Sequence, residues 1–559
     1  MINTSLLQLS KDELSKPLSK RIPCSIVFYP KVFYTEKPAI IYLHDWNKYP
    51  YTASICSLGK ELANQGYVFI SLGIYRRGVE GQMMAIPDND VDDIDRGIQY
   101  LKGNGCHNII LMGEGIGALG VLKYQLTKED NDIKGIVLIR PFNSLNNWLK
   151  NKIGETRYEA ILEKSAPEVI EGNEGLWVDF KVPYIAEESL LMYQSYESWL
   201  SWWSPNAETK ISDLLAEIST PVLAISPLQK INLNKINTSI INLDKKETVE
   251  TVVDSWLNQL EVDKTAKFQL DVTEMIPINE IISVKTSDNR SLIGLLWEDD
   301  RCQENKTIMI HVRGKTGTPI TEPLTSQMAE VYLNNKIATL VIELHRSGYG
   351  GSLESAAEMD VEDIHLFVQF ILKRGYTHII LSGQSLGSNS IMRYCVQHPA
   401  PNIKAMVHFA PTQDAATWLT KHLGSDSYNS LLEQAQKAVE NGQENLGLIG
   451  KPPYDKMLSP HRSNAWLSWW GPDADTANLK TISEVTIPIL MLCGSQDFFN
   501  DRQRLDILKA AAINSPLTDI IWYEGCGHNF ANFEQQAAND VINWFCLLYT
   551  SDAADEQQR

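Results

Sequence analysis

Residues 378–390 read HIILSGQSLGSNS, and this stretch decides the fold expected for the chain. Its first half is a short apolar run, which is typical of a buried strand. The residues after it, SNSIMRYCVQH (388–398), read as the beginning of a helix. Between the two lies Gly383-Gln384-Ser385-Leu386-Gly387, a G-x-S-x-G sequence. A tight strand-to-helix turn of this kind lifts a serine hydroxyl out of the end of a sheet and aims a helix N-terminus at it.

The flanking sequence alternates apolar strand-like runs with amphipathic helical runs. Helices are predicted over 326–335 and 361–375, and an antiparallel hairpin with its turn at 288–289 is predicted over 280–298. The other predicted strands are 307–312, 338–344, 405–410 and 488–494. This alternation predicts an α/β fold, in which a mostly parallel sheet is flanked by helices. A Trp-rich helical insertion at about 412–482 is expected to form a cap.

The same plan occurs twice in the chain. WLSWWSPNAET (199–209) matches WLSWWGPDADT (466–476), and HNIILMGEGIGALG (107–120) matches HIILSGQSLGSNS. These and other matches keep their order at an offset near 270 residues, which indicates a fused duplication. We therefore expect two tandem domains with helical caps, 1–265 and 266–545. Residues 546–559, which begin CLLYTSDAADE, are expected to be a non-native tail, with a native polar tail as the alternative.

Two further residues complete a candidate catalytic set with Ser385. Serine needs a base to become nucleophilic, and the base needs a carboxylate to orient it. Asp497 follows the predicted strand 488–494, and His528 lies in the Gly-rich sequence GCGHNF. We predict a Ser385, Asp497 and His528 triad, in which the histidine reaches across the end of the sheet.

With these motifs the chain resembles the α/β-hydrolase superfamily, over about 280–545 strongly and 20–260 in degenerate form. The order Ser, Asp, His is the order of that family. The resemblance implies an oxyanion hole of two backbone N–H groups. One belongs to Leu386, and the other belongs to Gly314 or Lys315, in a loop where relatives often carry His-Gly and this chain carries Arg-Gly.

The first copy lacks these reactive residues. Gly115 stands opposite Ser385, Lys230 stands opposite Asp497, and residues 240–250 contain no histidine. Without a nucleophile or a base acyl transfer has no route, so the first half is predicted to be a pseudo-enzyme. The Trp clusters at 199–203 and 466–470 occur in both copies, which favours a packing role over substrate contact.

The composition of the chain limits its expected partners, cofactors and location. A net charge of −19 argues against nucleic-acid and membrane-surface partners. There is no signal-like N-terminus and no bilayer-length apolar run, and the eight cysteines show no metal-site spacing. We expect a cytoplasmic protein without metal or other cofactors, whose first half packs on the second.

The leading hypothesis is a serine hydrolase that cleaves a small-molecule carboxylic ester through an acyl-enzyme. Peptidase, thioesterase and acyltransferase chemistry stay open, because the same triad performs all of them and the fold does not choose. The non-enzyme alternative is a binding or scaffold pseudo-hydrolase.

Overall fold

A computed structural model describes most of the chain and divides it into two compact units, residues 1–277 and 278–559. The described residues are 2–9, 23–31, 37–46, 48–77, 81–170, 177–183, 189–225, 238–241, 248–260, 268–321, 324–347, 351, 354–412, 414–442, 447–450, 459–474 and 476–557. The division lies C-terminal to the expected 265/266 boundary. This is because Phe268, Leu270 and Met275 join the first core and β11 (Ile276–Pro277) pairs with β1 (Ile2–Leu7).

The second unit is built on an eight-stranded sheet with the order β12-β13-β15-β14-β16-β17-β20-β21. Its strands are β12 (Glu280–Lys285), β13 (Ser291–Trp297), β14 (Thr307–Val312), β15 (Ala338–Ile342), β16 (His378–Gln384), β17 (Ile403–Phe409), β20 (Ile489–Gln496) and β21 (Thr518–Gly527). The first two form the predicted antiparallel hairpin, and the strands from β15 to β21 run parallel. The predicted mostly parallel sheet is therefore confirmed.

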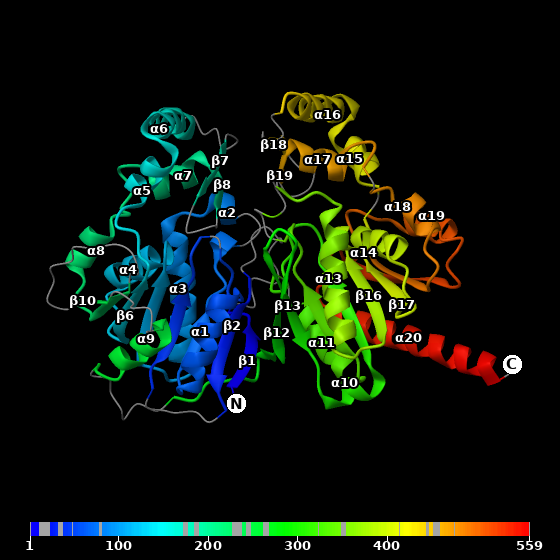
Figure 1. Ribbon diagram of the computed structural model, residues 1–559, viewed down its shortest axis with the longest axis horizontal. Helices are drawn as coiled ribbons and strands as arrows, with labels where there is room; N and C mark the ends of the chain where they lie inside the picture. Colours follow the sequence, from blue (N-terminus) through cyan, green and yellow to red (C-terminus); the bar gives the residue numbers. More distant parts are fainter. Residues whose placement is uncertain are drawn as a thin grey trace. The chain divides into compact units, whose positions relative to one another are not determined.

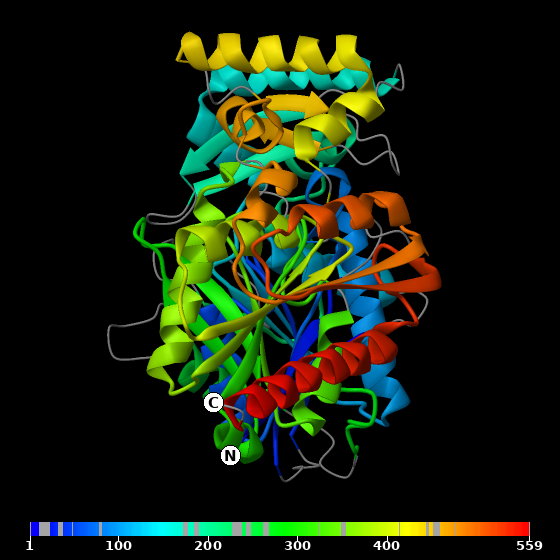
Figure 2. The same cartoon turned by 90° about the vertical axis from the view of Figure 1, so that its right-hand side faces the viewer.

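Helices cover both faces of this sheet (Figure 1). One face packs on α13 (Met359–Lys373), α14 (Leu386–Gln397), α18 (Asn478–Ser483) and α19 (Arg502–Ala511). In α13 the apolar residues Val361, Ile364, Val368 and Ile371 recur at helical spacing and turn one stripe into the core. The other face packs on α11 (Leu324–Asn334) and α20 (Glu534–Gln557), which lie side by side (Figure 2). A short helix, α10 (Asp300–Asn305), precedes β14.

The sheet of the first unit repeats this order. Eight of its strands run β10-β9-β6-β5-β3-β4-β2-β1 and correspond one to one with β21 through β12, and β11 is added at the edge. They are β1, β2 (Ser25–Pro30), β3 (Ala39–Leu43), β4 (Val68–Ser71), β5 (Ile109–Glu114), β6 (Ile133–Ile139), β9 (Val222–Ile225) and β10 (Thr238–Ile241). The helices around this sheet are α1 (Ala53–Asn64), α2 (Gly81–Met84), α3 (Pro87–Gly103), α4 (Gly117–Lys128), α8 (Ile211–Glu217) and α9 (Val249–Leu257). The duplication seen in the sequence is thus repeated in the strand order.

Each unit carries a cap beyond the carboxyl ends of its parallel strands (Figure 1). The second cap consists of α15 (Ala415–Leu423), α16 (Ser425–Glu440), β18 (Gly447–Gly450), β19 (Ser459–Arg462) and α17 (Ser463–Trp470). The first consists of α5 (Leu145–Ile153), α6 (Glu155–Ile170), β7 (Trp177–Pro183), β8 (Ser189–Ser195) and α7 (Tyr196–Trp203). Two helices, an antiparallel ribbon and a third helix therefore follow one another in both copies.

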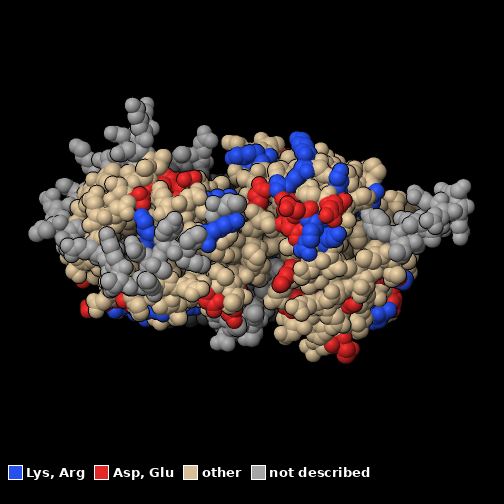
Figure 3. Space-filling view, turned by 90° about the horizontal axis from the view of Figure 1, so that it is seen from below, with Lys and Arg blue, Asp and Glu red and all other residues tan. Residues whose placement is uncertain are grey.

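Charged side chains of both signs mix on the surface. On the face drawn in Figure 3, acidic and basic groups gather in a common cluster. Ion pairs such as Lys336 with Glu304, at 3.0 Å, offset part of the acidic excess locally. In the described part of the chain, no helix has the length and apolar character needed to cross a bilayer.

Candidate active site

Ser385 occupies the sharp turn between β16 and α14. Its φ of 52° and ψ of −122° are strained for a residue with a side chain, as expected where backbone geometry serves a site. The neighbouring glycines are required by close approach. A Cβ on Gly383 would lie 2.5 Å from the Gly387 carbonyl oxygen, and one on Gly387 would lie 2.3 Å from that of Val312. The half-buried Ser385 is therefore held at the end of the sheet by a turn that has no room for a side chain at position 383 or 387.

Asp497 and His528 meet at the ends of β20 and β21. His528 Nδ1 lies 3.0 Å from Asp497 Oδ1, and the same oxygen accepts the Phe499 main-chain N–H at 2.7 Å. Asn500 Nδ2 and the Cys493 thiol each donate to the second oxygen at 3.2 Å. Burial opposes ionisation of Asp497, but His528, the Phe499 N–H and Asn500 together lower its pKa. An ionised carboxylate so placed orients an imidazole.

The loop that carries His528 contacts the turn that carries Ser385 through neighbouring residues. Gln384, which precedes Ser385, donates from Nε2 to Asn529 Oδ1 at 3.4 Å. The Ser385 main-chain N–H bonds the Phe409 carbonyl at 2.9 Å, and the Phe409 ring lies 5.4 Å from the Phe530 ring. Among the described residues no hydrogen bond joins the Ser385 hydroxyl to His528. Such contacts are often long before substrate binds.

The loop after β14 faces the serine. A Cβ on Gly314 would lie 3.1 Å from Ser385 Cβ and 3.6 Å from its hydroxyl oxygen, so a glycine leaves the space above the serine open. Arg346, which is buried, holds this loop from behind by donating to the carbonyls of Arg313, at 2.7 Å, and Gly314. Its Nε donates to Asp360 Oδ2 at 2.6 Å. This buried pair fixes the position of the loop.

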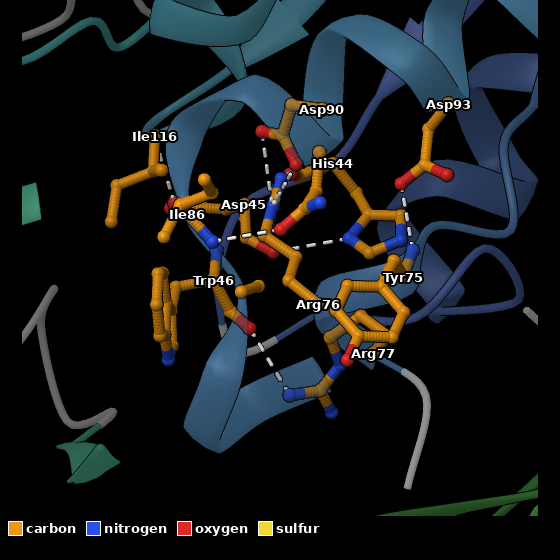
Figure 4. Close-up of polar contacts among 12 residues, drawn as sticks. His44, Asp45, Trp46, Tyr75, Arg76, Arg77, Ile86, Asp90, Asp93 and Ile116 are labelled. Atoms are coloured by element: carbon orange, nitrogen blue, oxygen red, sulfur yellow. Dashed lines mark hydrogen bonds and ion pairs between the residues drawn. The ribbon is translucent and has the colours of Figure 1, made fainter. Parts of the chain in front are cut away.

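The first unit keeps the backbone of the same loop and turn but carries different side chains there. Strand pairing aligns Leu43 and Gly113 as it aligns Val312 and Gly383, so Asp45 stands where the second unit has Gly314. Asp45 Oδ1 accepts the main-chain N–H of Ile116 at 2.9 Å and of Trp46 at 2.8 Å (Figure 4). A Cβ on Gly115 would lie 2.2 Å from the Asp45 carboxyl group. A carboxylate therefore fills the space above the first turn.

The two main-chain N–H groups that donate to Asp45 have counterparts in the second unit. Ile116 corresponds to Leu386, and Trp46 corresponds to Lys315. These two main-chain N–H groups converge on one oxygen in the first unit. Between the two predicted candidates for the second donor, Gly314 and Lys315, this correspondence favours Lys315.

Aromatic rings extend from His528 into the cap. The Phe499 ring lies 4.7 Å from the His528 ring and 4.8 Å from that of Trp418, and Trp418 lies 6.4 Å from Trp470. The ring of Phe498, which is 51% exposed, also contacts the His528 ring, at a centroid distance of 4.8 Å. The rings thus form a continuous series of contacts from the histidine into the cap.

The tryptophans common to both copies have equivalent packing contacts. Trp469 Nε1 donates to the Ser355 carbonyl at 2.8 Å, as Trp202 Nε1 donates to that of Ala85 at 2.7 Å. The hydroxyl of Tyr428 bonds the Trp470 carbonyl at 2.8 Å, as that of Tyr158 bonds the carbonyl of Trp203 at 2.7 Å. These contacts hold each cap to its own unit, as a packing role requires.

Sequence reasoning missed the buried pair of Arg346 and Asp360. Its signal was present, because Arg76 and Asp90 lie at the duplication offset and form the same pair at 3.0 Å. Two other predictions fall outside the described residues: Lys230, and most of the 240–250 segment that replaces the histidine loop. Within the described ranges, no group of three His, Cys, Asp or Glu side chains is placed to hold a metal.

Fold and turn together define the class: the chain is a hydrolase of the α/β-hydrolase superfamily. More narrowly, the family described as "Protein of unknown function (DUF1749)" matches residues 289–479, and the dienelactone hydrolase family matches residues 457–557. Both matches lie in the second unit. No curated protein is similar enough in sequence to match the chain.

Solved structures similar to this chain each cover about half of it. Est1E from Butyrivibrio proteoclasticus is 17% identical, covers 48% of this chain and 99% of its own, and has a TM-score of 0.36. A thermostable carboxyl esterase from Bacillus coagulans is 12% identical, with coverages of 48% and 97% and a TM-score of 0.39. The siderophore hydrolase EstB from Aspergillus fumigatus is 14% identical, with coverages of 49% and 98% and a TM-score of 0.37.

Proposed function

We propose that the second unit is a serine esterase that hydrolyses carboxylic esters of small molecules through an acyl-enzyme. The observation that carries the proposal is the hydrogen bond between Asp497 and His528, at the sheet end where β16 presents Ser385. The bond of Gln384 to Asn529 supports it, because these residues adjoin the serine and the histidine.

Each residue has a role that follows from its position. His528 takes the proton of the Ser385 hydroxyl as the oxygen attacks the ester carbonyl, and later returns it to the departing alcohol. Asp497 holds the ring with Nδ1 protonated and balances the charge of the imidazolium. The N–H groups of Leu386 and Lys315 stabilise the tetrahedral oxyanion, and water then releases the acid.

The first unit is proposed to be a pseudo-enzyme. Gly115 supplies no nucleophile, and Asp45 occupies the N–H groups that would bind an oxyanion. An anionic oxygen already hydrogen-bonded there excludes a second one, both by volume and by charge.

Labelling with a fluorophosphonate probe tests the proposal. Wild type is expected to be labelled, Ser385→Ala is expected to stay unlabelled, and Ser430→Ala, a change on the exposed side of α16, is expected to label like wild type. A panel of p-nitrophenyl esters of graded chain length, run beside thioester and peptide substrates, then ranks the chemistries. Folded wild type that takes up no probe would favour the binding-protein alternative.

A further inference from the structure

The Lys315 side chain reaches the cap from the loop that faces Ser385. Its Nζ lies 2.8 Å from His461 Nε2 and 5.1 Å from the centroid of the Trp470 ring. The Trp470 ring belongs to the series of ring contacts that leads through Trp418 and Phe499 to His528. The Lys315 amino group and the proposed triad histidine thus lie at the two ends of one series of aromatic contacts.

The first unit shows what this position does when no reaction is run. Its counterpart of Lys315 is Trp46, whose ring packs 5.2 Å from Trp202 and 6.1 Å from Trp203. There an indole fills the junction between loop and cap with apolar contacts. The amine of Lys315 replaces this indole only in the copy that has the predicted triad. Lys315 differs in this respect from the tryptophans that both copies share.

His461 serves as an acceptor at this junction. Trp470 Nε1 donates to His461 Nε2 at 3.3 Å, as Trp203 Nε1 donates to Gln194 Oε1 at 2.8 Å in the first unit. An imidazole that accepts at Nε2 carries its proton on Nδ1 and is neutral. A positive charge at this contact therefore belongs to Lys315, whenever its amine is protonated.

The surroundings of Lys315 disfavour that charge. Burial and, after it, the nearby Arg346 guanidinium lower the pKa of Lys315 to about 7. Arg346 itself pairs with Asp360, and neutral His461 adds no charge. A bound anion would favour the protonated amine, and Lys315 would be a stronger donor to that anion than to a neutral group.

We propose that Lys315 selects esters that carry a carboxylate in addition to the reacting ester group. The inference rests on the proposed esterase function, and it specifies the substrate class of the same site. The ester carbonyl would lie between Ser385 and the N–H groups of Leu386 and Lys315. The free carboxylate of the same substrate would then reach the Lys315 ammonium beside Trp470.

Matched ester pairs test the proposal. One pair places the charge on the acyl side, as 4-nitrophenyl hydrogen adipate against its methyl ester. The other places it on the alcohol side, as 4-acetoxybenzoate against its methyl ester. A charged hydrogen bond corresponds to a preference of about 10- to 100-fold in kcat/KM for the carboxylated member of one pair. The neutral member is the reference for each variant, so a general loss of activity cancels in the ratio.

Lys315→Met is expected to abolish the preference, and Lys315→Arg to retain it. Lys437→Met, on the exposed side of α16, is the control and keeps the wild-type ratio. In wild type the preference is expected below pH 7 and should decline above it as the amine loses its proton, whereas Lys315→Arg should keep it. The ratio removes any pH dependence of the reaction that both esters share.

The outcomes separate the two proposals. No preference in either pair, or an unchanged ratio in folded Lys315→Met, overturns the substrate inference while esterase activity stands. Absence of both probe labelling and hydrolysis of every ester overturns the esterase function itself.

Discussion

Replacing Gly314 with aspartate should close the second active site as Asp45 closes the space in the first unit. Asp45 accepts two main-chain N–H bonds, at 2.9 and 2.8 Å, while a Cβ at Gly115 would overlap its carboxyl group. Hydrogen bonds to a charged group contribute about 1.5–3 kcal/mol each. Freeing both donors for an oxyanion would therefore cost about 3–6 kcal/mol, or roughly 10²- to 10⁴-fold in kcat/KM.

The assay is hydrolysis of a neutral p-nitrophenyl ester, with fluorophosphonate labelling and circular dichroism on the same samples. Gly314→Ala is the matched control, because its Cβ meets Ser385 Cβ at 3.1 Å and requires only a small shift. It should lose much less activity than Gly314→Asp. A folded Gly314→Asp protein with more than a tenth of wild-type activity would refute the reasoning that an internal carboxylate occupies this site.

Four further outcomes are expected. Asp497→Asn should lower kcat by about 10⁴-fold in an ester assay, because His528 is then held in the wrong tautomer. Arg346→Lys should lower kcat while the fold persists, since one ammonium cannot hold the Arg313 and Gly314 carbonyls and Asp360 together; kcat set against the melting temperature measures this. Gly387→Ala should lower the melting temperature by forcing a Cβ within 2.3 Å of a backbone oxygen. The lowered pKa of Asp497 means that its ionised form stabilises the fold above its ordinary pKa of 3.8; this contribution should disappear in acid titration of wild type as the pH falls through the lowered value, and Asp497→Asn should lack it.

The local sequence pattern was sufficient to predict individual strands, the hairpin and the turn at Ser385. The buried strand 307–312 is found as β14, and the hairpin over 280–298 is found as β12 and β13. The turn at Ser385 was readable because a G-x-S-x-G sequence between a strand and a helix admits few backbone geometries. The proximity of Asp497 and His528 was predicted from their positions after two strand-like runs and from the Ser, Asp, His order along the chain, and in the structure they lie within hydrogen-bonding distance.

Contacts between distant residues were not readable. The side chains of Lys315, in the loop after β14, and His461, in the cap, are in contact, and the sequence around neither residue predicts this contact. The same holds for the Asp45 carboxylate, which was overlooked because nothing in HDWN marks an aspartate that turns back on its own loop. The first unit extends to residue 277 and not to the predicted 265, because residues within 268–277 pack into the first unit by tertiary contact rather than by a local signal.

The Asp45 carboxylate also limits what a substitution at Gly115 could restore. Any side chain at Gly115 would begin 2.2 Å from that carboxyl group, so the two cannot occupy this space together. A serine at position 115 would require the Asp45 side chain to turn away and give up its bonds to the Ile116 and Trp46 main-chain N–H groups. Restoring a nucleophile at Gly115 alone would therefore leave an internal carboxylate competing for the two N–H groups that an oxyanion needs.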